Sequence, residues 1–241
     1  MANDKQELRE GIWRALEEAG AARFPGARGR IPNFRGAEAA AERLTGLEAW
    51  REAKVLKCNP DSPQRKVRHR ALVEGKRVYM AVPKLADERP FVQLDPGVLA
   101  KEHLWEASSI KGASEHGEPV SIDDMDAIDL VVTGCVAVAR DGVRLGKGGG
   151  YSDLEYAVLR EAGKVTADTP VVTTVHEAQV VGTGDVPKQP QDVTLDMAVT
   201  PDEVVSMPER ASRPPGVLWD RLSEDKIRSI PLLAKLRGEP S

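Results

Sequence analysis

The residues best suited to chemistry lie in one glycine-rich stretch, residues 144–153, which reads Arg-Leu-Gly-Lys-Gly-Gly-Gly-Tyr-Ser-Asp. An apolar run over residues 128–139 precedes it and predicts a buried strand, while residues 154–162 predict a helix. A glycine-rich turn between a strand and a helix presents bare backbone N–H groups to a phosphate. We therefore expect a phosphate site here, and a mobile surface turn is the alternative that these residues alone leave open.

The charged side chains of the stretch fit a site for a phosphate and a metal ion. Arg144 and Lys147 bring positive charge, and Asp153 brings a carboxylate that could hold a cation beside the phosphates. Glycines let the backbone approach a bulky anion because they carry no Cβ atom, and those expected to do so are Gly146, Gly148, Gly149 and Gly150. The spacing matches neither the dinucleotide fingerprint nor a P-loop.

The start of the predicted helix allows a purely structural interpretation as well. Ser152 and Glu155 have the spacing of a helix-capping box, which needs no catalytic role. The helix dipole would favour Asp153 in the first turn, but this carboxylate would repel a phosphate at the same end of the helix. A divalent cation between them removes the conflict, and Mg²⁺ suits carboxylate and phosphate oxygens.

Other candidate groups lie outside this stretch. Lys5 and Arg9 are one turn apart on a predicted helix over residues 5–19, where they could grip a triphosphate or simply face solvent. His176, followed by a glutamate, ends a predicted strand and is a minor catalytic candidate. A predicted loop carries four arginines that could bind phosphates or a polycarboxylate, or could belong to a flexible segment: Arg23, Arg28, Arg30 and Arg35.

These groups must be positioned by strands and helices, which the sequence predicts in alternation. Further helices are predicted over residues 36–50 and from a cap at 59–63 to residue 74. Strands are predicted over residues 54–58, 77–83, 91–94, 128–139, 169–176 and, at an edge, 193–200. The pattern predicts an α/β fold of three layers, with a mostly parallel sheet and helices on both faces. Ligands of such sheets bind at the carboxyl ends of the strands.

Composition limits the classes of function. The 241 residues carry a net charge of −4 and only 4% aromatic side chains, so we expect no nucleic-acid partner. We expect neither a signal peptide nor a membrane span, and therefore a cytoplasmic protein. Cys58 and Cys135 lie far apart in apolar runs, as buried hydrophobic residues do. We expect one domain over residues 1–241, with residues 208–241 as an arm packed on it.

Residues 144–153 resemble the Arg-Leu-Gly-x-Gly-x-Gly-Tyr-Tyr-Asp signature of the 5-formyltetrahydrofolate cyclo-ligase family (methenyltetrahydrofolate synthetases). Lys5-x-x-x-Arg9 is similar to the family's N-terminal motif, and residues 75–83 are similar to its Gly-Lys-strand-Pro element. Four segments look like the methenyltetrahydrofolate synthetase domain-containing branch in particular: residues 30–37, 59–64, 145–156 and 215–219. The motifs follow the order of the family along nearly the whole chain.

The resemblance implies a ligase that uses ATP and Mg²⁺ to convert 5-formyltetrahydrofolate to 5,10-methenyltetrahydrofolate through a phosphorylated formyl group. It implies ATP contacts at Lys5, Arg9, Arg144, Gly146, Lys147, Gly148, Gly149, Gly150, Tyr151 and Asp153, with Lys5 and Arg144 catalytic. Asp153 and Asp192 would hold the metal, and Asp61, Tyr151 and Ser152 would contact the substrate. The expected partner is a small molecule, a reduced folate, without nucleic acid or membrane, and the protein would be a monomer or a weak homodimer.

Several residues depart from the family pattern. Ser152 replaces a second tyrosine, Leu154 replaces an arginine that often follows the aspartate, and Gln191 replaces a histidine. Asp61 is the only acid left in a stretch that is acidic in the family. Two other functions therefore remain open: ATP-dependent cyclisation or ligation of a different substrate, and a non-enzymatic module that binds a nucleotide or a folate.

Overall fold

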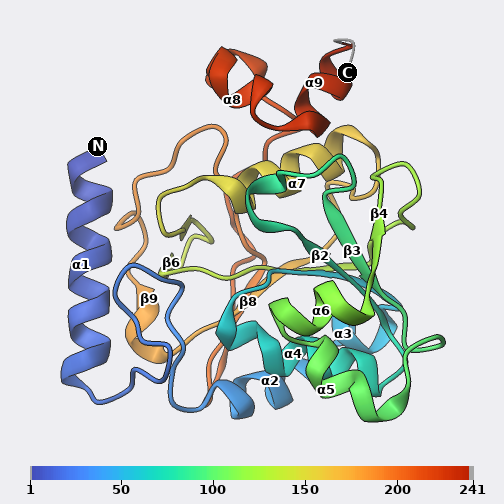
Figure 1. The fold of residues 1–241 in the computed structure, drawn as a ribbon. Helices are drawn as coiled ribbons and strands as arrows, with labels where there is room; N and C mark the ends of the chain where they lie inside the picture. Colours follow the sequence, from blue (N-terminus) through green and yellow to red (C-terminus); the bar gives the residue numbers. More distant parts are fainter. Residues whose placement is uncertain (1, 239–241) are drawn as a thin grey trace.

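An eight-stranded sheet forms the centre of the protein in a computed structural model that describes residues 2–238 (Figure 1). The strand order is β11-β10-β8-β5-β1-β2-β3-β4, and the five strands from β10 to β2 run parallel. The strands are β1 Val55–Cys58, β2 Arg77–Ala81, β3 Phe91–Leu94, β4 Glu118–Val120, β5 Leu130–Val132, β8 Val171–Thr174, β10 Met197–Val199 and β11 Val204–Ser206. The predicted α/β fold with a mostly parallel sheet is confirmed.

Helices cover both faces of this sheet. The helices are α1 Ala2–Glu18, α2 Ala37–Thr45, α3 Glu48–Glu52, α4 Arg65–Val73, α5 Leu104–Ala107, α6 Ile110–His116, α7 Tyr151–Glu161, α8 Glu224–Arg228 and α9 Pro231–Arg237. Successive side chains of a strand point to opposite faces, so Val78 packs with α2 to α6 on one side and Tyr79 packs with α7, α8 and α9 on the other. Figure 1 shows these two layers of helices below and above the sheet.

A second sheet, of three strands, lies beside the first and was not expected from the sequence. It consists of β6 Ala137–Ala139, β7 Arg144–Leu145 and β9 Val180–Val181, and its apolar side chains pack on α1. The prediction of a single strand over residues 128–139 is wrong, because the run divides into β5 and β6, which belong to different sheets. Gly134 marks the break: a Cβ atom there would lie 2.9 Å from Asp61 Oδ2.

Other element boundaries also differ from the predictions. The helix expected over residues 36–50 is two helices, α2 and α3, separated at Gly46. The strand expected at an edge over residues 193–200 is β10, an inner strand, because β11 pairs with it outside. β4, α5 and α6 were not predicted from the sequence. For β10 and β4 the local pattern was short, and pairing with β11 and β3 respectively decided the outcome.

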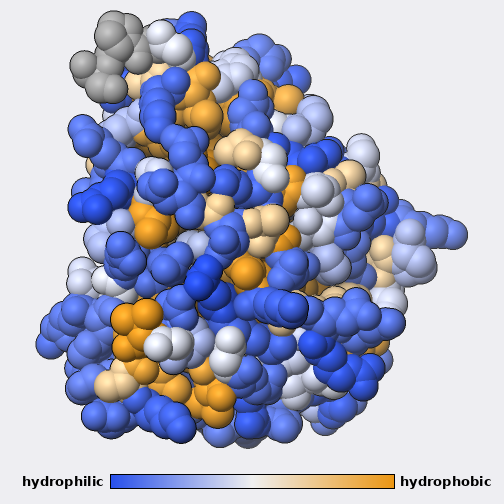
Figure 2. Space-filling model, turned by 90° about the vertical axis from the view of Figure 1, so that its right-hand side faces the viewer, coloured by the Kyte–Doolittle hydropathy of each residue, from blue (hydrophilic) through white to orange (hydrophobic). Residues whose placement is uncertain are grey.

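The C-terminal segment packs in the layer of helices that contains α7. Ile227, Ile230, Leu232 and Leu233 are buried in the same apolar cluster as the side chains of that helix. Residues 239–241 of the predicted arm lie outside the described residues. Figure 1 shows α8 and α9 above α7, and Figure 2 shows another face of the molecule, where hydrophilic residues predominate. Within residues 2–238, no helix has the length and apolar character that crossing a membrane requires.

The packing of the arm is tested by substitution of Leu233, whose side chain is fully buried. Leu233→Ala removes its buried methyl groups and leaves a cavity, and we expect the free energy of unfolding to fall by about 2–5 kcal/mol. Urea denaturation followed by circular dichroism measures the change. Arg228→Ala, at an exposed position of α8, is the control and should change stability by less than about 0.5 kcal/mol. Equal stability of the two variants would show that the arm is not packed.

Candidate functional site

The glycine-rich turn leaves β7 and enters α7 with two glycines in left-handed backbone conformations. Gly148 has φ +110° and Gly150 has φ +67°, values that side chains other than glycine rarely tolerate. Gly150 is the N-cap residue of α7 and provides no side-chain hydrogen bond to the first turn. The free N–H groups at the start of this eleven-residue helix therefore remain available to a ligand.

The helix begins one turn earlier than predicted, so the interpretation of Ser152 and Glu155 as a capping box is wrong. Ser152 Oγ instead accepts a hydrogen bond of 2.7 Å from Asn59 Nδ2. The Glu155 carboxylate is buried and accepts a hydrogen bond from Lys57 Nζ. Both side chains thus connect α7 to the end of β1, and neither caps the helix.

Two cationic side chains of α1 contact residues that lie more than 130 positions later in the sequence, in the turn and near it. Arg9 Nε donates a hydrogen bond of 2.7 Å to the Gly146 carbonyl oxygen, and Lys5 Nζ lies 2.6 Å from Asp192 Oδ2. Partial burial lowers the pKa of Arg9, an effect that Asp192 partly offsets. The alternative in which Lys5 and Arg9 only face solvent is therefore wrong, since Arg9 bonds to the turn and Lys5 pairs with Asp192.

Arg144 is buried beneath the turn. One terminal nitrogen lies 2.6 Å from Asp153 Oδ1, and the other donates to the Gly134 carbonyl oxygen at 3.1 Å. Its Nε atom is buried and has no hydrogen-bond partner among residues 2–238. Burial is the largest single effect and acts to lower the pKa of Arg144, but Asp153, Cys135 and Asp192 together outweigh it and the net pKa is raised. The guanidinium therefore stays charged and fixes Asp153.

Asp153 and Asp192 are suited to a hard cation. Asp153 Oδ1 also accepts a hydrogen bond of 3.0 Å from Val193 N, and Asp192 Oδ2 accepts one of 2.8 Å from Gln189 N. The other oxygen of each carboxylate has no hydrogen-bond partner among the described residues. Both carboxylates act on the pKa of Arg144, which places them in one neighbourhood. Two carboxylates beside a glycine-rich turn fit Mg²⁺.

A cavity of about 360 Å³ lies between the turn and the carboxyl ends of β1 and β2. The predicted substrate residues Asp61, Tyr151 and Ser152 all line it, and Lys147 Nζ lies 3.6 Å from Asp61 Oδ1. Of the other predicted residues, Arg144, Gly146, Lys147, Gly149, Gly150 and Asp153 line this cavity, whereas Lys5, Arg9, Gly148 and Asp192 do not. The position agrees with the rule that open α/β sheets bind ligands at the carboxyl edge.

The sequence analysis missed a buried polar group at the floor of this cavity. Lys57 on β1 is 1% exposed, and its Nζ donates to Glu155 and, at 2.9 Å, to Asn59 Oδ1. Asn59 and Glu155 line the cavity. A signal was present, because a lysine inside the apolar run of β1 is rarely buried without a partner.

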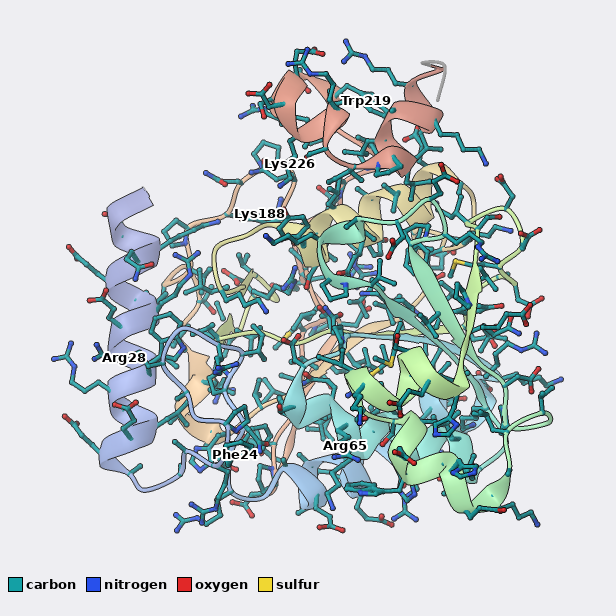
Figure 3. The ribbon with its side chains drawn as sticks, in the orientation of Figure 1. Phe24, Arg28, Arg65, Lys188, Trp219 and Lys226 are labelled. Atoms are coloured by element: carbon teal, nitrogen blue, oxygen red, sulfur yellow. The ribbon has the colours of Figure 1, made fainter. Side chains whose placement is uncertain are left out.

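Other candidates do not join this site. The four arginines that follow α1 (Arg23, Arg28, Arg30 and Arg35) are exposed. Figure 3 shows Phe24 and Arg28 of this segment far from Lys226, which lies near the glycine-rich turn. His176 Nδ1 accepts a hydrogen bond of 3.2 Å from Ala178 N, and Gln179 completes a cap of a short 3₁₀ helix, Glu177–Gln179. The contacts of His176 are therefore those of a structural residue.

The cysteines provide no nucleophile. Cys58 and Cys135 are free and buried. Burial raises the pKa of both thiols, and that of Cys135 rises to about 11. Since the thiolate is the reactive form, both are inert at neutral pH.

Comparison with known proteins agrees with the arrangement of these motifs. Residues 1–201 match the sequence profile of the 5-formyltetrahydrofolate cyclo-ligase family. The chain belongs to this family. It is also similar to the methenyltetrahydrofolate synthase domain-containing proteins of Bos taurus and Mus musculus, with 37% and 38% identity over 98% and 97% of the chain. The chain spans only 62% and 63% of the length of these two relatives.

A solved structure has a fold similar to that of this chain. The 5,10-methenyltetrahydrofolate synthetase of Aquifex aeolicus superposes with a TM-score of 0.52 over 90% of this chain and 99% of its own. The two sequences are 19% identical, so the likeness concerns the fold alone.

The buried pair of Lys57 and Glu155 gives a prediction for stability. Glu155→Leu leaves an unpaired ammonium in the interior, and we expect a loss of about 3–5 kcal/mol in the free energy of unfolding. The double variant Lys57→Met/Glu155→Leu removes both charges and should recover most of that loss. Urea denaturation of the single variants Lys57→Met and Glu155→Leu, the double variant and the parent measures the coupling. Additive losses would mean that the two groups do not interact.

Proposed function

We propose that this chain is an ATP-dependent ligase that converts 5-formyltetrahydrofolate to 5,10-methenyltetrahydrofolate. The observation that carries the proposal is the convergence of Lys5, Arg9 and Arg144 on one glycine-rich turn that opens into a cavity. Membership of the 5-formyltetrahydrofolate cyclo-ligase family supports it.

The turn is the proposed site of the nucleotide triphosphate. Backbone N–H groups of Gly148, Gly149 and Gly150 and of the first turn of α7 would donate to phosphate oxygens. Arg9 and Lys147 would add charge from opposite sides of the turn. Lys5 and Arg144 are the proposed catalytic residues, because a transferring phosphoryl group is stabilised chiefly by fixed positive charge.

The proposed metal site comprises Asp153 and Asp192, each with an oxygen left without a hydrogen bond. Mg²⁺ bound there would neutralise phosphate charge. Lys5 and Arg144 hold the two carboxylates at 2.6 Å, so the site is oriented by the same cations that face the phosphates. Asp153 would no longer repel a nucleotide at the start of α7.

The remainder of the cavity is proposed to hold the reduced folate. Asp61, Tyr151 and Ser152 would contact it, with Asn59 and Glu155 at the floor and Ile31 and Ile110 on apolar walls. Ring closure requires the neighbouring amine nitrogen outside the pterin ring to attack the activated formyl carbon. A C–N bond forms, the amine loses its proton, and the C–O bond to phosphate breaks. The protein must orient the two groups and needs no nucleophile of its own, which agrees with the inert cysteines.

Several broader expectations belong to the same proposal. We propose that residues 1–241 form a single domain, with residues 208–241 as its arm. The protein would act on a small molecule in the cytoplasm, as a monomer or weak homodimer, and would bind neither nucleic acid nor a membrane.

A second candidate function is ATP-dependent cyclisation or ligation of a different substrate. The observation that favours it is the substrate end of the cavity, where Ser152 is tied to Asn59 and a buried ion pair forms the floor. A protein that hydrolyses ATP only with another heterocycle, and not with 5-formyltetrahydrofolate, would support this candidate.

The test of the proposed function is methenyltetrahydrofolate formation, followed by absorbance, with and without ATP and Mg²⁺. Arg9→Gln removes a cation from the turn, and we expect kcat/KM for ATP to fall by about tenfold or more, the effect of one hydrogen bond to a charged group. Arg14→Gln, at an exposed position of the same helix, should behave as the parent.

The outcomes are distinct. Folded parent protein that forms no product with ATP and Mg²⁺ would refute the cyclo-ligase proposal. Product formation with equal rates in both variants would keep the reaction but refute the role of Arg9.

A further inference from the structure

Lys226 of α8 lies against the glycine-rich turn, although it comes after the family match at residues 1–201. Its Nζ donates a hydrogen bond of 3.3 Å to the Gly149 carbonyl oxygen and lies 4.8 Å from the centre of the Tyr151 ring. Figure 3 shows Lys226 on the side of the arm that faces the start of α7. The arm therefore brings a cation to the turn that none of the family motifs contains.

The charge of Lys226 is not neutralised. Within the part of the chain that the structure describes, no carboxylate is within ion-pair distance of its Nζ. A carbonyl oxygen and the face of an aromatic ring attract an ammonium group but carry no net negative charge. An anion at the turn would supply the missing countercharge.

A small cavity on the arm side of the turn supports a ligand there. It has a volume of about 130 Å³, and Lys226 and Arg221 of the arm line it together with Gly150, Asp153 and Gln191. The Gln191 Oε1 atom is buried without a hydrogen-bond partner among the described residues. Gly150 and Asp153 also line the larger cavity, so the start of α7 is open on two sides.

The arm holds Lys226 in place. Ser223 Oγ caps α8 by accepting a hydrogen bond of 3.2 Å from Lys226 N, and Ile227 is 1% exposed in the cluster that includes α7. Arg237 of α9 pairs with Glu224 of α8 at 2.9 Å. Since the backbone is anchored on the helix that starts at the turn, little entropy is lost when the side chain binds a ligand.

We infer that the C-terminal arm completes the polyphosphate site and that Lys226 binds the phosphates of the nucleotide directly. The inference rests on the proposed function in that it takes ATP as the ligand. The ammonium exchanges its weak bond to Gly149 for phosphate oxygens, which are stronger acceptors because they are charged. The added cation favours a triphosphate over a monophosphate.

The test is calorimetric titration of the full chain with ATP and with AMP, both in the presence of Mg²⁺. Lys226→Gln should raise the Kd for ATP about tenfold, as expected for a hydrogen bond to a charged group, and leave that for AMP nearly unchanged. Lys226→Arg should restore most of the affinity for ATP. Arg228→Gln is the matched control on the same helix, where Arg228 is exposed and pairs with Asp225, and it should bind as the parent does.

The failure of this inference is distinguishable from that of the proposed function. Parent protein that binds no ATP refutes both. Equal ATP affinity of Lys226→Gln and the parent overturns the role of Lys226 and leaves the proposed function intact. An equal loss of ATP and AMP affinity, with a lowered melting temperature, would show that Lys226 only fastens the arm and would also overturn it. Triphosphate-selective loss without cyclo-ligase activity would support the inference alone.

Discussion

The buried contact between Arg144 and Asp153 is the interaction on which the rest of the site depends. It joins β7 of the small sheet to the first turn of α7, and the same two side chains hold Gly134 and Val193 through backbone hydrogen bonds. Gly134, Arg144, Asp153 and the more distant Val193 are thereby fixed around one glycine-rich turn. Because Arg144 is 3% exposed, loss of Asp153 would leave a buried guanidinium without its countercharge.

Electrostatics divides the site into two parts. Around the turn, Lys5, Arg9 and Lys147 supply positive charge in a chain whose net charge is −4, so the cationic character is local. At the floor of the cavity, the charges of Lys57 and Glu155 cancel, so the floor is polar without net charge. Such a division suits a charged nucleotide beside a largely neutral heterocycle.

Sequence patterns predicted the parts of this arrangement that are local. The glycine-rich turn and most central strands follow from residues within one segment, whereas the role expected of Lys5 and Arg9 followed from the family resemblance. The division of residues 128–139 between two sheets could not be predicted from the run itself, because β5 pairs with β1 and β8 whereas β6 pairs with β7 and β9. Likewise, Glu155 fitted a capping pattern locally, and only its partner Lys57 on β1 shows that it is a buried charge.

The central claim is that the turn at the start of α7 binds the phosphates of a nucleotide. Backbone amide NMR during a titration with ATP and Mg²⁺ tests it most directly. The account predicts the largest chemical-shift changes at the amides of Gly148, Gly149, Gly150 and Tyr151. Unchanged resonances there, or changes confined to the arginine-rich segment of residues 23–35, would contradict it.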